Sequence, residues 1–155
     1  MAQTNYIENL EGKGFWIDNA YLEITLEFIC DVLEKNLDLY EDWIKEHYEI
    51  LKNNRLGNFL GFMDLALDYL ETEKRKEFFI QILEKAKDSL VLKEEISVEE
   101  LNEYESKKPQ ELRSTFIASL KVFKIIKILD EIIKMINEGE DYNNESFSLE
   151  ENVDI

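Results

Sequence analysis

Proline and glycine, which end helices and form tight turns, are scarce in this chain. Its 155 residues contain one proline and five glycines. A β-sandwich or a β-barrel needs many short strands joined by turns rich in these residues, so the composition excludes both folds. Hydrophobic residues make up 45% of the chain, which is enough to form a core and argues against disorder throughout. We therefore expect one all-α domain.

The spacing of apolar residues predicts a compact bundle of five or six helices, formed by residues 1–138. Asp18 or Asn19 is placed to cap the first helix, and Thr72 is placed to cap the fourth. Ser97 and Glu100 have the spacing of a capping box at the start of a later, short helix. The last helix has no internal breaker and is expected to be long. Helices are expected over residues 19–35, 38–53, 58–71, 72–92, 97–107 and 109–138.

The two ends of the chain are expected to lie outside the helices. Residues 1–17 form a polar lead-in, with a glycine-containing turn that places Phe15 and Trp16 against the core. The last segment, residues 139–155, carries six acids and no base. We expect this segment to be a disordered acidic tail.

The net charge of −17, from 35 acids and 18 bases, limits the partners that the chain can have. Such a charge repels nucleic acids and anionic membranes and attracts basic proteins. No uncharged run approaches the roughly 18 residues that a membrane-spanning helix needs. Residues 1–14 lack the apolar segment of a secretory signal, and the single cysteine fits a reducing compartment. We expect a cytoplasmic protein whose partner is a basic protein, not nucleic acid or a membrane.

The sequence has no motif typical of catalysis, cofactor binding or metal binding. His47 is the only histidine and lies in an apolar stripe with Trp43 and Ile44, so we interpret it as a core residue. One histidine cannot supply the two Glu-x-x-His motifs of a di-iron bundle. Cys30 lies at the edge of the apolar face of the first helix and is interpreted as a structural thiol. The glycine motifs of nucleotide-binding loops are absent. We therefore expect no enzymatic activity, no cofactor and no metal.

Two acid-rich stretches are candidate surfaces for binding a partner. One lies opposite the apolar face of the first helix. The other covers a loop and a short helix, and its tyrosine is of a type favoured at interface hot spots. The alternatives are a solvated helix face and a solvated connector. The candidate partner-binding residues are Glu23, Glu27, Asp31, Glu94, Glu95, Glu99, Glu100, Glu103 and Tyr104.

The last predicted helix carries two apolar faces. The first face contains Leu112, Phe116, Leu120 and Phe123. The second is rotated from it by roughly 150°, so a continuous helix would contact two different neighbours. One neighbour could be a second copy of the protein, as in a homodimer. The candidate self-association residues are Ile125, Leu129, Ile132 and Ile136.

In size, charge, helical content and lack of a catalytic motif, residues 15–138 resemble the small acidic helical immunity proteins of bacterial toxin systems. The resemblance implies that the chain binds a cognate basic toxin, foremost a nuclease-type effector, through an acidic surface and neutralises it. Nuclease toxins are basic because they bind phosphate backbones. A self-associating structural or adaptor module is the alternative function. The acidic faces could also mimic nucleic acid.

Overall fold

The described part of the chain, residues 4–57 and 63–149 of a computed structural model, contains five α-helices and two small antiparallel sheets. The prediction of an all-α fold is therefore wrong, although most of the structure is helical. The elements are β1 (Thr4–Glu8), β2 (Gly14–Asp18), α1 (Asn19–Glu34), α2 (Asp42–Arg55), α3 (Glu73–Leu90), β3 (Glu95–Ile96), α4 (Val98–Glu105), β4 (Leu120–Lys121) and α5 (Val122–Glu138).

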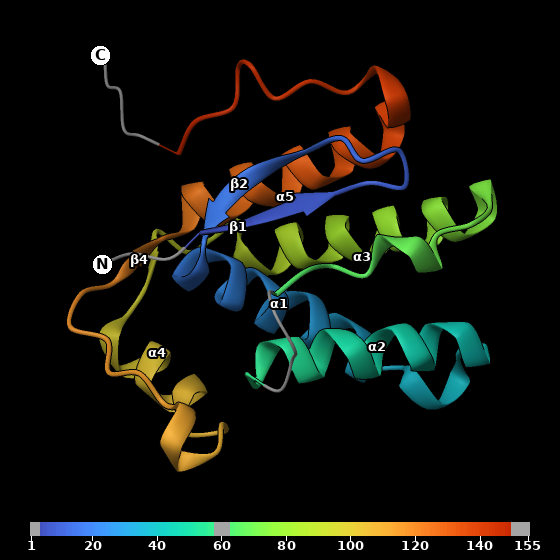
Figure 1. The fold of residues 1–155 in the computed structure, drawn as a ribbon. Coiled ribbons are helices and arrows are strands. Elements are labelled where there is room, and N and C mark those ends of the chain that lie inside the picture. The colour runs from blue at the N-terminus through green and yellow to red at the C-terminus, as the bar shows by residue number, and fades with distance from the viewer. Residues whose placement is uncertain (1–3, 58–62, 150–155) are drawn as a thin grey trace.

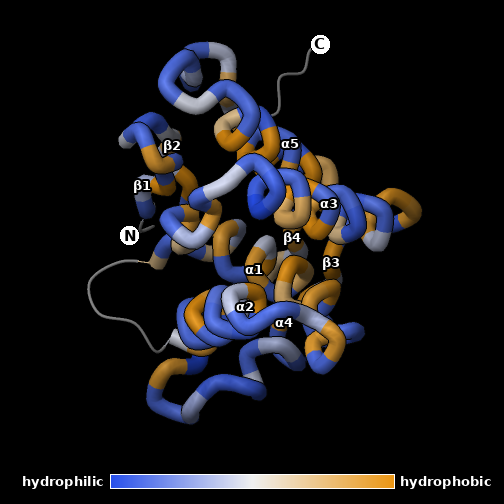
Figure 2. The backbone as a smooth tube through the Cα atoms, turned by 90° about the vertical axis from the view of Figure 1, so that its right-hand side faces the viewer, coloured by the Kyte–Doolittle hydropathy of each residue, from blue (hydrophilic) through white to orange (hydrophobic). Residues whose placement is uncertain are grey.

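Helix α1 is the centre of the fold. It packs against α2, α3, α5 and β2, and most of its side chains are buried. In Figure 1 the β1–β2 hairpin and α5 lie above α1 and α3, and α2 lies below them. Figure 2 shows that hydrophobic positions of these helices face the interior. Among the described residues, no helix is both long and apolar enough to cross a membrane.

The N-terminal lead-in is a β-hairpin and not an irregular segment. Tyr6 pairs with Trp16 and Ile7 with Phe15. Because successive residues of a strand point to opposite faces, Ile7 and Phe15 enter the core while Trp16 stays 63% exposed. The prediction that Phe15 lies against the core is confirmed. The same prediction for Trp16 is wrong, because strand alternation turns it outward.

Asn9 and Gly14 fix this hairpin in place. The Asn9 side chain accepts hydrogen bonds from two backbone N–H groups of the turn, at 3.0 and 3.1 Å. Its amide nitrogen donates to the carbonyl oxygens of Met135 and Gly139 at the end of α5, at 3.0 and 2.9 Å. At Gly14 a Cβ atom would lie 1.8 Å from the carbonyl oxygen of Ile7. Only glycine fits at so close an approach of two backbones.

Three helix starts that rest on local capping signals are confirmed. The Asp18 carboxylate accepts from the N–H of Tyr21 at 3.0 Å and caps α1. Thr72 caps α3, where its hydroxyl accepts a backbone N–H at 3.2 Å. Ser97 and Glu100 form the predicted capping box of α4. A cap satisfies backbone groups that the helix itself leaves unpaired, so its sequence signal is local and readable.

The single long helix predicted over residues 109–138 is wrong over residues 109–121. Only residues from Val122 onward form the α-helix, and in the described part of the chain the segment before β4 contains a short 3-10 turn at Gln110–Leu112 and no further helix or strand. The Asn102 side chain bonds both the N–H and the carbonyl oxygen of Phe116, at 2.8 and 3.1 Å. Glu105 accepts the N–H of Ser114 at 2.8 Å. These α4 side chains take up backbone groups that a helix would have paired internally.

The helix predicted over residues 58–71 is also not observed in its described part. Residues 58–62 lie outside the described residues, and the following segment contains only a short 3-10 turn at Leu67–Tyr69. The α2 side chains of Asn54 and His47 hold the carbonyl oxygens of Asp64 and Leu65, at 3.0 and 2.9 Å. These two carbonyl oxygens therefore bond to α2 side chains and not to backbone N–H groups of a helix. The second predicted helix begins later than expected, at residue 42.

The acidic tail is ordered over residues 139–149, so the prediction of disorder is wrong there. Tyr142 is buried, and the ring of Phe147 packs edge-on against Phe15 at 4.7 Å between centroids. The Asn144 amide donates to the carbonyl oxygen of Gly14 at 2.6 Å. Its aromatic residues thus tie this acidic segment to the hairpin. The predicted tail residues 150–155 lie outside the described residues.

The apolar face proposed for self-association is used within the chain itself. Ile125, Leu129, Ile132 and Ile136 are all buried in the core, where α5 packs against α1 and α3. The interpretation of these residues as a free second face is therefore wrong. It arose because a helical wheel shows that a face is apolar but not which neighbour covers it.

Candidate functional site

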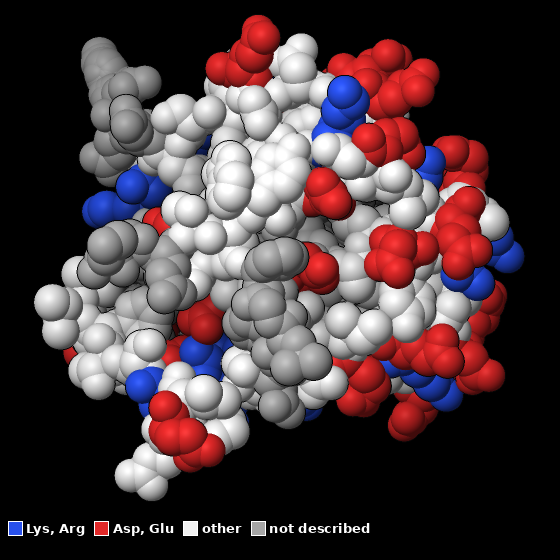
Figure 3. Space-filling model, in the orientation of Figure 1, with Lys and Arg blue, Asp and Glu red and all other residues white. Residues whose placement is uncertain are grey.

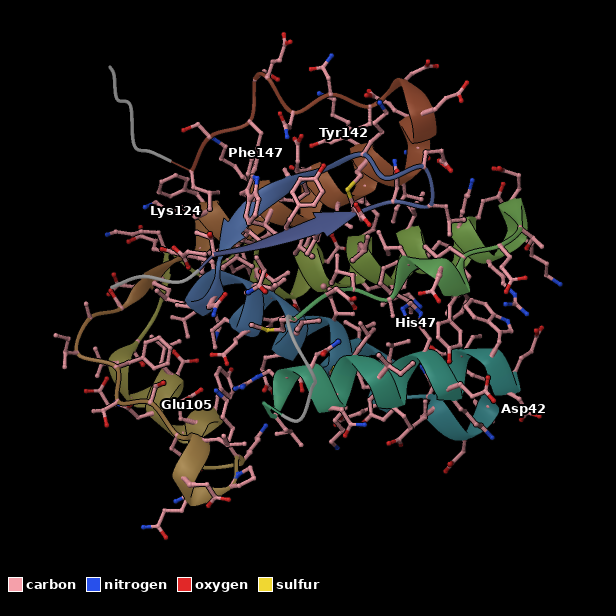
Figure 4. All side chains as sticks on the ribbon, in the orientation of Figure 1. Asp42, His47, Glu105, Lys124, Tyr142 and Phe147 are labelled. Carbon is pink, nitrogen blue, oxygen red and sulfur yellow. The ribbon has the colours of Figure 1, made fainter. Side chains whose placement is uncertain are left out.

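A buried ionic cluster joins α1, α2 and α4. Arg55, at the end of α2, donates from Nε to Glu27 Oε1 at 2.8 Å, and its Nη1 lies 3.7 Å from Glu105 Oε2. Lys108 Nζ lies 2.7 Å from Glu23 and 3.0 Å from Glu105. Figure 4 shows Glu105 on α4 beside the C-terminal end of α2. The cluster therefore holds the α4 segment against the central helix.

This cluster removes two of the predicted partner-binding residues from consideration. Glu27 is buried, and its second oxygen lies 3.1 Å from Lys107 Nζ. Glu23 is half-buried against Lys108. The helical wheel placed both carboxylates opposite the apolar face, but it could not show that bases some 80 positions later cover them. These two carboxylates are paired with bases of the chain itself.

Tyr104 is the point where the two predicted acidic stretches meet. Its ring contacts Phe28 of α1 at 6.2 Å between centroids, and Lys107 Nζ lies 5.3 Å from the ring centre. Burial, followed by the charges of Glu100, Glu27, Asp31 and Glu103, raises the pKa of Tyr104 to about 12. The structure thus brings together residues of α1 and α4 that no sequence pattern had paired.

The remaining predicted residues divide into paired and unpaired carboxylates. Glu95 lies 3.8 Å from Lys121 and accepts from Ser119, while Glu100 lies 2.9 Å from Lys93. Of the predicted partner-binding residues, three are exposed carboxylates with no ion pair in the described part of the chain: Glu94, Glu99 and Glu103.

Replacing Asp31 with asparagine is expected to raise the free energy of unfolding by about 1 kcal/mol near neutral pH. Burial, followed by the charge of Glu27, raises the pKa of Asp31 to about 6, and Lys107 opposes the shift. The ionised carboxylate therefore opposes folding above this pH. As the pH falls from about 6 toward 4, the folded state takes up a proton that the unfolded chain does not yet bind, and the wild type becomes more stable.

Urea unfolding of Asp31→Asn and of the wild type at about pH 7.5 and about pH 4.5 measures this effect. The advantage of the variant should shrink at the lower pH. Asp88→Asn is the matched control, because Asp88 is exposed on α3 and should respond little at either pH. An advantage of Asp31→Asn that does not change with pH would contradict the expectation.

His47 and Cys30 lie inside the core. His47 Nε2 lies 2.9 Å from the carbonyl oxygen of Leu65 and donates to it, while the ring stacks on Tyr69. Burial lowers the pKa of His47 and raises that of the Cys30 thiol. These shifts favour the uncharged form of both groups. The prediction that His47 is a core residue is confirmed, and Cys30 is buried as well. In residues 4–57 and 63–149, no group of three or more His, Cys, Asp or Glu side chains is arranged to hold a metal ion.

The outer face of the hairpin carries a surface that the sequence analysis missed. The exposed Trp16 contacts the ring of Tyr6 at 5.3 Å between centroids. A hollow of about 350 Å³ beside Tyr6 is lined by three exposed carboxylates, and none of them has a lysine or arginine partner in the described part of the chain. Figure 3 shows an uncharged patch over the hairpin with acidic side chains along its right side. The three carboxylates are Glu8, Asp64 and Asp68.

One sequence signal could have found the hairpin, although not the whole surface. Asn5 to Glu8 and Phe15 to Asp18 alternate inward and outward residues on either side of a glycine-containing turn, the pattern of a hairpin. The strands are only five residues long, so the alternation is short. Asp64 and Asp68 come from a distant segment, and only the fold brings them beside Tyr6.

Comparisons of the chain with protein-family models, with curated proteins and with solved structures find no match. Function is therefore inferred from the chemistry of these surfaces alone.

Proposed function

We propose that this chain is a cytoplasmic immunity or inhibitor protein that binds a basic protein toxin and neutralises it without catalysing a reaction. A nuclease-type toxin is the expected target, because an enzyme that binds phosphate backbones carries a basic surface. Blockade requires a stable complex between complementary surfaces, and it needs neither a cofactor nor a metal.

The distribution of charge is the observation that supports this proposal. The buried cluster contains three acids and three bases and is neutral as a unit. The whole net charge of −17 is therefore carried by other residues. A field of this sign speeds the capture of a basic protein, with steered association reaching about 10⁸–10⁹ M⁻¹s⁻¹ at low salt.

The alternative of a self-associating module has less support. Its four candidate residues on α5 are buried in the core of the chain itself. A second copy would also carry a net charge of −17, and the repulsion between two such molecules opposes association.

Co-expression tests the proposed function. The chain is expressed together with each candidate toxin encoded beside its gene, and the survival of the host cells is measured. We expect survival with one toxin, and a one-to-one complex whose association rate falls as salt is raised. If no neighbouring product is toxic, or if the chain fails to protect against each toxic one, the proposal is wrong.

A further inference from the structure

We propose that the outer face of the β1–β2 hairpin is the docking surface for the basic partner, and that it receives an arginine side chain of that partner. The inference rests on the proposed function and names the place and the chemistry of contact. The docking surface consists of the Tyr6–Trp16 pair and the adjoining hollow, whose carboxylates are Glu8, Asp64 and Asp68.

The aromatic pair is held in a fixed position before any partner arrives. Tyr6 and Trp16 are opposite each other in the strand register, and the inward neighbours of both, Ile7 and Phe15, are locked in the core. Rigid, exposed Trp and Tyr side chains lose little conformational entropy on binding and are typical hot-spot residues. An exposed indole on a rigid hairpin is thus suited to be the apolar centre of an interface.

The chain itself shows how such a ring accommodates a cation. Over Trp43, the guanidinium carbon of Arg75 lies 4.7 Å from the ring centre, a cation–π contact. Trp16 has no such cation among the described residues. Lys124 lines a second hollow, also of about 350 Å³, to which Trp16 contributes, but its Nζ lies over Tyr21, 5.6 Å from the ring centre. The face of Trp16 therefore remains available to a cation from a partner.

The carboxylates beside Tyr6 determine the charge of the group that binds there and favour a planar one. They repel phosphate groups and the acidic surface of a second copy, and they attract a base. A planar guanidinium can stack on an aromatic ring and pair with a carboxylate through two N–H groups, which an ammonium cannot do. The open indole of Trp16 contacts Tyr6, and Tyr6 lines the hollow whose three carboxylates have no lysine or arginine partner among the described residues. This arrangement therefore fits arginine better than lysine.

Titration with N-acetyl-argininamide, followed by NMR of the ¹⁵N-labelled protein, tests the docking surface. We expect a saturable shift of the Trp16 indole N–H and of the backbone signals of β1, β2 and residues 64–68. The uncharged isostere N-acetyl-citrullinamide should produce no saturable shift. If the largest shifts occur around Tyr104 or Trp43, or if no signal of the hairpin moves, the proposal is overturned.

Two triple variants with equal changes in net charge separate local binding from the general field. In the hollow variant, Glu8→Gln, Asp64→Asn and Asp68→Asn should weaken argininamide binding about tenfold. The asparagine at position 64 keeps the oxygen that accepts the N–H of Ala66. The control variant carries Glu46→Gln, Glu49→Gln and Glu77→Gln, on exposed residues of α2 and α3. It should bind argininamide as the wild type does, and equal weakening of binding in both variants would overturn the proposal. Melting curves verify that both variants are folded.

The co-expression assay separates failure of this inference from failure of the proposed function. If the wild type protects and the Trp16→Ala variant loses protection while remaining folded, the hairpin is the docking surface. If both protect equally, the docking surface lies elsewhere and the immunity function stands. If the wild type does not protect, the function itself is wrong, and the argininamide titration still decides whether the hairpin binds a guanidinium.

Discussion

Replacing Arg55 with methionine is expected to lower the free energy of unfolding by about 3 kcal/mol. Arg55 is buried between Glu27 and Glu105, which are buried as well. Methionine fills similar space but leaves two carboxylates short of a positive charge inside the protein. Each keeps one lysine, Lys107 or Lys108, so the expected loss lies at the lower end of the range for breaking a buried ion pair.

Rescue by replacing a carboxylate with a neutral amide makes this prediction specific. Adding Glu105→Gln to Arg55→Met should recover more than half of the lost stability, because the cluster is then neutral again, with Glu27 paired to Lys107 and Glu23 to Lys108. Lys52→Met is the matched control. Its ion pair with Glu34 is 3.5 Å long and exposed, so urea unfolding should show a loss below about 1 kcal/mol. A loss at Arg55 no larger than this would contradict a structural role for the cluster.

Replacing Ile132 with glutamate is expected to unfold the protein, with a loss of more than about 4 kcal/mol. Ile132 is fully buried in α5, so the carboxylate would enter a packed core with no base to pair with. Circular dichroism at 25 °C and urea titration measure the loss. Ile117→Glu, at a position 91% exposed, is the control and should change stability by about 0.5 kcal/mol or less.

The same variant distinguishes the two interpretations of α5. If its apolar face were an interface between copies, Ile132→Glu would give a folded monomer in sedimentation, with a melting curve close to that of a wild-type monomer. If that face is core, the variant loses its helical signal. A folded Ile132→Glu monomer would overturn the packing of α5 described above.

Elements specified by nearby residues could be predicted from the sequence. Helices α1, α3 and α4 begin where their caps, Asp18, Thr72 and Ser97, predict. In each case the signal lies within four residues of the structure that it specifies. The burial of His47 was also predictable, because it lies within an apolar stripe.

Elements specified by distant residues could not be predicted from the sequence. The segment before β4 is not an α-helix because Asn102 bonds both backbone groups of Phe116, and no local pattern indicates these two hydrogen bonds. The predicted acidic face of α1 is partly covered because Lys108 reaches Glu23, 85 positions away. The hairpin surface could not be predicted for the same reason, since only the fold brings Asp64 beside Tyr6.

The contacts between the hairpin and the tail bear on how the protein is made. Gly14 accepts a hydrogen bond from Asn144, 130 positions later, and Asn9 bonds to Gly139 across the same span. Phe15 likewise packs against Phe147, 132 positions later. Such long-range contacts form late, and the apolar surface that they cover stays open until then. In a nascent chain the apolar side of the hairpin would stay exposed to solvent until residues 139–147 had been translated. A stop codon before these residues would therefore leave part of the core uncovered and favour aggregation.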